Sequence, residues 1–190
     1  MVLTANETDG SRRIGDVGDV RLAPMSVEHA AAWYRWREQP SSQRHNPLFP
    51  LTVGDLTRRL STVCTSDLTD RTRYEYRWIV ELGGEAIGTV ATERPAWGMG
   101  YAEIGYMLSD THHGRGYGTR AVALLVDKLF RETKLHRIFA LISVENMPSR
   151  RLVERLGFIN EGQMREHYRI QGRRVDEIIY GLLRHEWTPL

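Results

Sequence analysis

The chain of 190 residues contains one cysteine, Cys64, and only two lysines, Lys128 and Lys134. A single cysteine cannot form an internal disulfide and provides no cysteine-based metal centre. No stretch resembles a signal peptide or a membrane-spanning run, so we expect a cytoplasmic protein in a reducing compartment, with no membrane partner. The net charge of +2 gives no reason to expect bulk binding of nucleic acid.

The composition is that of an ordinary globular protein. Hydrophobic residues make up 41% of the chain and charged residues 26%, and the length suffices for one domain with a substantial core. Residues 1–18 are polar and lack apolar periodicity, which predicts a flexible N-terminal tail. We therefore expect a single domain over residues 19–190.

Apolar periodicity and turn signals predict the order of strands and helices. Gly83-Gly84 between two strand-like runs indicates a hairpin, and Thr52 followed by Asp55 is typical of a capped helix start. Three prolines within residues 39–50 predict a loop. The predicted strands span residues 20–25, 76–82, 86–92, 102–108, 137–144, 166–170 and 175–183, and the predicted helices span residues 26–38, 52–66, 116–132 and 146–156. This order predicts an α+β fold with a mixed, mostly antiparallel central sheet and helices on both faces.

The most informative stretch runs from Tyr101 to Thr119. There a strand with one carboxylate leads through a glycine-rich turn into an amphipathic helix. Gly114, Gly116 and Gly118 let the backbone curl tightly and approach a ligand. The N–H groups of such a turn, at the positive end of a helix dipole, form a site for a diphosphate. The alternating glycines differ from the dinucleotide fingerprint, and no Gly-Lys-Ser/Thr follows, so the stretch predicts a phosphorylated carrier beside a candidate base.

Three stretches, in order, resemble the GNAT acyltransferases and, within them, the branch that acetylates the N-termini of ribosomal proteins. The first is HGRGYG at residues 113–118, where the family has Gln/Arg-x-x-Gly-x-Gly/Ala. The second is NMPS at residues 146–149, followed by a helix that closes on Gly157-Phe158. The third runs from Glu161 through the last hairpin to YGLL at residues 180–183. The resemblance covers about residues 19–187 and implies an N-acetyltransferase with the acyl-CoA N-acyltransferase fold, using acetyl-CoA as cosubstrate.

The resemblance also implies where coenzyme A binds. Its diphosphate would lie on the amides that open the long helix. Its pantetheine arm would pair with strand 103–108, where this strand splays from the next one. The amide near Met107 or Leu108 would polarise the thioester carbonyl. The residues expected to bind acetyl-CoA are Tyr106, Met107, Leu108, His113, Gly114, Arg115, Gly116, Tyr117, Gly118, Thr119 and Asn146.

Glu103 and Ser149 are the expected catalytic residues. An ammonium group with a pKa of about 10 must lose a proton before it attacks, and Glu103 would accept that proton directly or through water. Ser149 or water would protonate the departing sulfur, because Val153 stands where many relatives carry a tyrosine acid. Purely structural roles stay open for both residues, since Glu103 could bond a neighbouring strand and Ser149 could serve only the first helical turn.

The acceptor amine is expected between the first two helices and the last hairpin, as in relatives with this fold. The expected lining is Trp33, Tyr34 and Tyr168, with Trp36, Arg44 and His45 as further candidates. The amine could belong to a peptide N-terminus or to a small molecule such as an antibiotic or metabolite. A larger acyl group such as succinyl and a CoA-binding module without turnover are further alternatives. No metal is expected, because His112 and His113 lack a third ligand, and the last hairpin could pair with a second copy in a homodimer.

Overall fold

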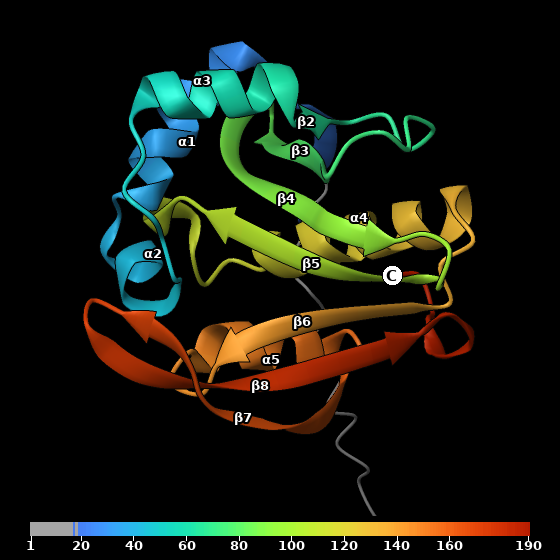
Figure 1. Cartoon of the computed structure of the whole chain (residues 1–190). Coiled ribbons are helices and arrows are strands. Elements are labelled where there is room, and N and C mark those ends of the chain that lie inside the picture. The colour runs from blue at the N-terminus through green and yellow to red at the C-terminus, as the bar shows by residue number, and fades with distance from the viewer. Residues whose placement is uncertain (1–16, 18) are drawn as a thin grey trace, which may run out of the picture.

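The computed structural model describes residues 17 and 19–190, so the predicted tail, apart from Val17, lies outside the described residues. One eight-stranded sheet forms the body of the molecule, in the order β1-β3-β4-β5-β6-β8-β7, with β2 paired to β3 (Figure 1). Among the strands of the described residues, the β2–β3 and β5–β6 pairs are parallel and the others antiparallel. The strands are β1 (Val20–Pro24), β2 (Cys64–Thr65), β3 (Glu75–Leu82), β4 (Glu85–Ala96), β5 (Tyr101–Leu108), β6 (Arg137–Ser143), β7 (Ile159–Ile170) and β8 (Arg173–Leu183). The predicted α+β fold with a mixed, mostly antiparallel sheet is confirmed.

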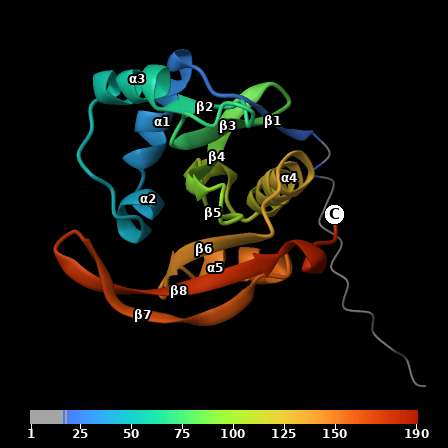
Figure 2. The same cartoon turned by 45° about the vertical axis from the view of Figure 1, so that its right-hand side comes forward.

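Helices cover both faces of this sheet, as Figures 1 and 2 show from two directions. One face carries α1 and α3, which enclose a small core with β3, and the other carries α4 and α5 over the main core. The α2 helix lies beside the tip of the β7–β8 hairpin, where Gln171 Nε2 donates to the carbonyl of Gln43 over 3.4 Å. The helices are α1 (Ala30–Arg37), α2 (Pro40–His45), α3 (Val53–Thr62), α4 (Tyr117–Glu132) and α5 (Met147–Arg155).

The start and the buried face of α4 follow from its sequence. Ala121, Leu125, Val126 and Leu129 are all 0% exposed, and their spacing of one, three or four residues places them on one side of a helix. The observed helix begins at Tyr117, within one residue of the predicted start. None of the helices in the described part of the chain is long and apolar enough to cross a membrane.

The sheet opens between β5 and β6. These parallel strands pair only from Tyr101 with Arg137 to Glu103 with Phe139. Beyond this point β5 continues along β4, and β6 continues along β8. The two halves of the sheet therefore separate toward α2 (Figure 1). Along this opening, the edges of β5 and β6 that face each other are not paired with each other. The predicted splay of strand 103–108 from the following strand is confirmed.

The prediction of a loop over residues 39–50 is wrong for its first half, which forms α2. Pro40 occupies the first turn of this helix, where its missing N–H removes no helical hydrogen bond. The helix is also fixed by distant contacts, since the Ser41 hydroxyl donates to Asp110 and Gln39 Oε1 accepts from the Asp110 amide over 2.9 Å. A tertiary contact thus orders a segment whose prolines suggested a loop.

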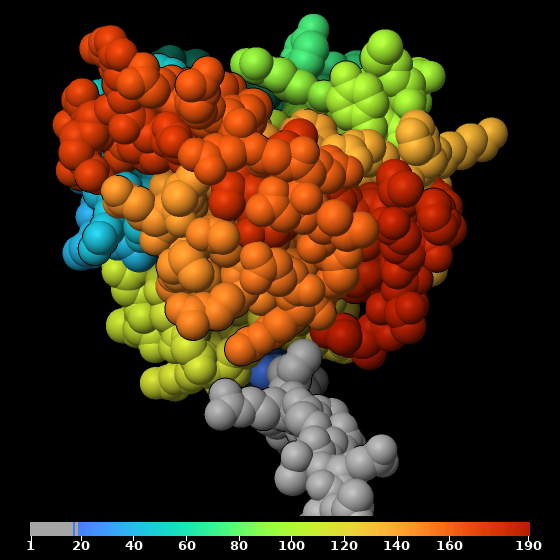
Figure 3. All heavy atoms as spheres, turned by 90° about the horizontal axis from the view of Figure 1, so that it is seen from below, coloured from blue at the N-terminus to red at the C-terminus, as the bar shows by residue number. Residues whose placement is uncertain are grey.

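Other boundaries differ by less. The helix predicted for residues 26–38 is divided into a 3₁₀ turn, Val27–His29, and α1. The first strand of the last hairpin, predicted for residues 166–170, begins at Ile159. This strand, β7, forms one edge of the sheet, and all its residues except Met164 and Ile170 are exposed. Seen from below, β6–β8 and α5, in orange to red, make up most of the surface (Figure 3). Pairing of this hairpin with a second copy stays a prediction.

Candidate functional site

A cavity of about 790 Å³ occupies the opening between β5 and β6. Its walls come from segments far apart in the sequence: α2, the end of β4, β5, the turn before α4, β6, the start of α5, and β7 with β8. A volume of this size lies within the range of roughly 300–1,000 Å³ that is usual for small-molecule and cofactor sites. The opening of the sheet is therefore the candidate site.

The glycine-rich turn forms the end of the cavity that leads to α4. Gly114 and Gly116 have φ angles of 75° and 87°, in the left-handed region that favours glycine. Gly116 is the N-cap of α4, so it has no side chain to satisfy the first amides of the helix. At Gly118 a Cβ atom would lie 3.1 Å from Leu152 Cδ1, which ties the turn closely to α5. Amides arranged in this way can bind the oxygens of a diphosphate.

Two hydroxyl groups meet where β5 faces the start of α5. The Tyr106 hydroxyl lies 2.5 Å from Ser149 Oγ. The Ser149 amide donates to Asn146 Oδ1 over 3.2 Å, so Asn146 caps α5 as the sequence predicts. Burial raises the pKa of Tyr106 above its usual range, which keeps its phenol protonated. Val153 is 0% exposed in the main core and takes no part in this wall of the cavity.

Glu103 lies on the other face of β5, because side chains alternate along a strand. Burial, reinforced by the nearby carboxylates of Glu93 and Glu177, raises the pKa of Glu103 to about 7. A carboxylate with this pKa is half ionised near neutral pH and can accept a proton from an ammonium group more readily than an exposed glutamate can. The cavity thus has a titrating carboxylate on one side of β5 and a pair of hydroxyls on the other.

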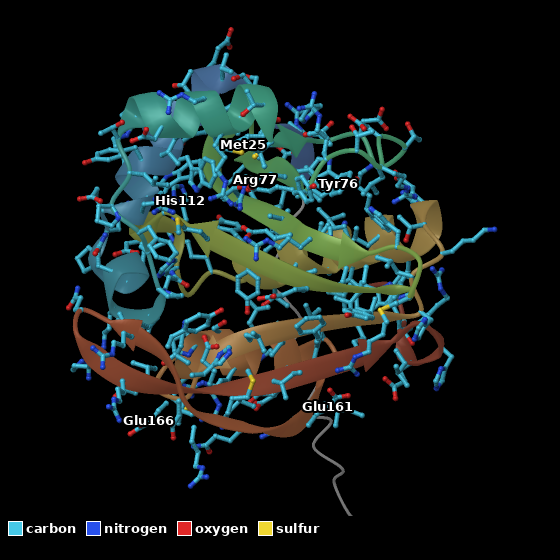
Figure 4. All side chains as sticks on the ribbon, in the orientation of Figure 1. Met25, Tyr76, Arg77, His112, Glu161 and Glu166 are labelled. Atoms are coloured by element: carbon cyan, nitrogen blue, oxygen red, sulfur yellow. The ribbon has the colours of Figure 1, made fainter. Side chains whose placement is uncertain are left out.

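An arginine network holds Glu93 beside Glu103. The two glutamates are direct cross-strand partners on β4 and β5, and Arg77 Nη2 donates to Glu93 Oε1 over 2.8 Å. Arg77 also binds Glu75, and Arg59 Nε donates to Glu75 Oε2 over 2.6 Å. Although burial raises the pKa of Glu75, Arg77 and Arg59 outweigh it and hold that pKa below its usual range. Figure 4 shows Arg77 beneath α3. Glu93 is therefore fixed where its charge acts on Glu103.

A bulge in β7 shapes the wall opposite β5. The pairing of β7 with β8 is irregular between Met164 and Tyr168, and Tyr168 beyond it lines the cavity. Glu177, which is 3% exposed, is hydrogen-bonded through Oε2 to His167 Nδ1 over 2.8 Å. Burial raises the pKa of Glu177, while the bond to His167 acts in the opposite direction. Bulges commonly re-aim side chains next to sites of this kind.

Most of the predicted site residues lie around this one cavity. Arg115 lies in the turn and Tyr117 begins α4, and neither residue lines the cavity. The structure does not bring Trp33 and Tyr34 to the cavity: Trp33 is 2% exposed inside the small core under α1 and α3, and Tyr34 packs against that core. The predicted residues that line the cavity are Glu103, Tyr106, Met107, Leu108, His113, Gly114, Gly116, Gly118, Thr119, Asn146, Ser149 and Tyr168.

Sequence reasoning missed several residues of the cavity wall. Glu93 and Glu177 stand next to Glu103 through strand pairing and sheet topology, which residue spacing alone does not reveal. The signal that could have found Glu93 is the turn between β4 and β5, because counting outward from both sides of that turn brings Glu93 close to Glu103. His45 was a candidate from the sequence and does line the cavity, on α2, and its Nδ1 is buried without a hydrogen-bond partner among the described residues. Within the described residues, no group of three or more His, Cys, Asp or Glu side chains is placed to hold a metal ion.

Comparisons with known proteins agree on one family. The family model described as "Acetyltransferase (GNAT) domain" matches residues 19–159. An uncharacterized N-acetyltransferase, p20 of Bacillus licheniformis, is 30% identical over 88% of this chain and 94% of its own length. The putative ribosomal N-acetyltransferase YdaF of Bacillus subtilis is 37% identical over 45% of this chain and 47% of its own length. The spermidine N(1)-acetyltransferase of Escherichia coli is 28% identical over 64% of this chain and 67% of its own length.

A solved structure resembles the whole fold. Mycobacterium smegmatis RimJ in complex with CoA-disulfide superposes with a TM-score of 0.79 at 27% sequence identity. The superposition covers 90% of this chain and 84% of that protein.

Proposed function

The chain belongs to the GNAT acetyltransferases and is an N-acetyltransferase that uses an acyl-CoA, and we propose that it moves an acetyl group from acetyl-CoA to a primary amine by direct attack. The observation that carries this proposal is the opening between β5 and β6, which has Glu103 with a pKa of about 7 on one side. The Tyr106 and Ser149 hydroxyls lie on the other side. Acyl transfer needs a proton acceptor for the amine and a stabiliser for the leaving thiolate, and these groups could supply both.

Acetyl-CoA would enter from the side of α4 and α5. Its diphosphate would lie on the amides that follow Gly116 at the start of α4, and its pantetheine arm would run along the edge of β5 that β6 leaves unpaired. The thioester would then reach the level of Met107 and Leu108, where a backbone amide could donate to its carbonyl oxygen. The RimJ complex with CoA-disulfide supports a coenzyme A derivative as the donor.

The acceptor would approach from the face that carries Glu103. Glu103 takes one proton from the ammonium group, and the neutral amine attacks the thioester carbon. The C–N bond forms as the carbonyl π electrons move onto oxygen. That electron pair then re-forms the C=O bond while the C–S bond breaks with its electron pair going to sulfur. The proton lost from the newly bonded nitrogen completes the thiol of coenzyme A.

Two classes of acceptor have support. A peptide N-terminus is favoured by the likeness to the putative ribosomal acetyltransferase YdaF. A small polycationic amine is favoured by the carboxylates Glu93, Glu103 and Glu177 in the cavity wall, and by the spermidine acetyltransferase relative. We propose the peptide N-terminus first, with the small amine as the alternative.

The proposal is tested by mass spectrometry of acceptors incubated with the purified protein and acetyl-CoA. The acceptors are a peptide with a free N-terminus, the same peptide with a blocked N-terminus, and spermidine. One acetyl group on the free peptide and none on the blocked peptide is the expected result. Acetylation of spermidine alone would select the small-amine alternative, and a faster reaction with succinyl-CoA would change the donor. Binding of acetyl-CoA with no transfer to any amine would leave a CoA-binding module and refute the proposed activity.

A further inference from the structure

The contact between Tyr106 and Ser149 joins the two walls of the donor side of the cavity. Tyr106 comes from β5, which pairs with β4, whereas Ser149 comes from α5, which packs on the half of the sheet that contains β6 and β8. Both residues line the cavity. The 2.5 Å separation between their hydroxyl oxygens is that of a short O–H···O hydrogen bond.

The backbone around Ser149 is held at both ends of α5. Its amide is bound by the cap residue Asn146. The other end of α5 is held by Tyr180, whose hydroxyl donates to Glu154 Oε1 over 2.6 Å and accepts from Arg150 Nε over 3.1 Å. With Ser149 Oγ in contact with Tyr106, the direction of the Ser149 O–H bond depends on whether Tyr106 donates or accepts.

We take Tyr106 as the donor to Ser149, because a phenol is a better hydrogen-bond donor than an aliphatic hydroxyl and both contacts of the Tyr106 hydroxyl are with oxygens of Ser149. The phenol stays protonated because burial raises its pKa, and its hydroxyl has Ser149 as its hydrogen-bond partner, through Oγ at 2.5 Å and the backbone carbonyl at 3.5 Å. When Tyr106 donates to Ser149 Oγ, the Ser149 hydrogen is released to point at a third group. Hydrogen bonds in such a chain also strengthen one another, so a serine that accepts from tyrosine becomes a better donor.

We propose that Tyr106 is a positioning residue for Ser149: the phenol donates to Ser149 Oγ, and Ser149 turns its own O–H toward the departing sulfur of coenzyme A. This inference rests on the proposed function. As the C–S bond breaks, the sulfur keeps the electron pair and accepts a hydrogen bond from Ser149, which stabilises the thiolate. Neither hydroxyl loses its proton, because the acylated nitrogen supplies the proton that completes the thiol.

The test compares two acyl donors whose leaving groups differ in how much stabilisation they need as the bond to the acyl carbon breaks. Acetyl-CoA leaves as a thiolate, whereas its selenoester analogue leaves as a selenolate, which is the conjugate base of a much stronger acid. Tyr106→Phe removes one hydroxyl and should lower kcat with acetyl-CoA about tenfold, and Ser149→Ala should lower it by more. With the selenoester both losses should shrink toward none. The loss in kcat should exceed any loss in affinity for acetyl-CoA, which calorimetric titration measures for both variants.

Tyr180→Phe is the matched control, because it removes another buried tyrosine hydroxyl that holds α5 but does not line the cavity. Any effect of this variant should be the same with both donors. In the Ser149→Ala background, Tyr106→Phe should have no further effect, since its action passes through Ser149.

Two results would overturn the inference while the proposed function stands: equal losses with both donors in Tyr106→Phe, or the same loss from Tyr106→Phe with and without Ser149. If Tyr106→Phe does not fold, the kcat of Ser149→Ala alone decides. A loss of kcat in Ser149→Ala that is as large with the selenoester as with acetyl-CoA refutes the role of the serine. Wild-type protein that acetylates no amine would refute both the inference and the proposed function.

Discussion

Replacing Glu103 with glutamine should stabilise the folded protein at alkaline pH even though it removes the proposed base. The pKa of Glu103 is raised from 4.5 to about 7, chiefly by burial. Between these two values the folded protein keeps a proton that the unfolded chain has released. Stability therefore falls as the pH rises from ~4.5 to ~7 and stays low above that, and glutamine, which does not titrate, avoids the loss.

The size of the effect follows from the same two pKa values. For one site, the linkage relation gives a cost of about 1 kcal/mol at pH 5 and about 3 kcal/mol at pH 8. The free energy of unfolding of Glu103→Gln, relative to wild type, should therefore rise by about 2–3 kcal/mol between these pH values. A constant effect of the amide on packing cancels in this difference.

The assay is urea unfolding of both proteins at pH 5 and pH 8. The matched control is Glu161→Gln, labelled in Figure 4 on β7, because the bond from Arg137 holds the pKa of Glu161 below its usual range. Its carboxylate stabilises the folded state above the unfolded pKa, so this variant should lose stability at both pH values. A relative stability of Glu103→Gln that does not change between pH 5 and pH 8 would refute the raised pKa, and with it the main argument for Glu103 as the base.

Two further predictions concern the charge beside the site and the start of a helix. Glu93→Gln removes a negative charge that raises the pKa of Glu103. The acidic limb of the pH profile of kcat/KM should therefore move to lower pH by about half to one unit. An unmoved limb would show that Glu93 does not act on the base. Thr52→Ala removes the hydroxyl that accepts from the Asp55 amide over 3.1 Å and should cost about 1 kcal/mol, or roughly 2–4 °C in Tm, without changing kcat, whereas an unchanged Tm would mean that this cap contributes nothing.

The parts of the fold that could be predicted from sequence depend on local signals. The Thr52 cap, the Gly83-Gly84 turn and the start of α4 after Gly116 each need only neighbouring residues, and the structure has all three. The order of strands and helices follows from these signals together with apolar periodicity. The residues of the glycine turn that line the cavity could be predicted because the turn, too, depends only on neighbouring residues.

The residues that were misplaced depend on contacts across the fold. Trp33 lies under Arg77, whose Cζ is 4.3 Å from the centre of its ring, and the helical pattern of α1 does not reveal which face meets that arginine. The α2 helix is fixed by Asp110, about seventy residues away in the chain. Glu177 reaches the cavity through its pairing with Ser143 on β6. Sheet order and register decide these positions, and neither can be read from spacing.

Calorimetric titration with coenzyme A of the wild type and of Gly116→Val asks whether the turn before α4 holds the donor. Gly172→Val is the control for backbone strain, since Gly172, in the β7–β8 turn, has a φ of 78° against 87° for Gly116 and lies outside the cavity wall. We expect saturable binding to the wild type and to Gly172→Val, and a loss of at least about tenfold in affinity for Gly116→Val, which disturbs the diphosphate amides. Equal affinity of all three proteins would place coenzyme A elsewhere and contradict the proposed site.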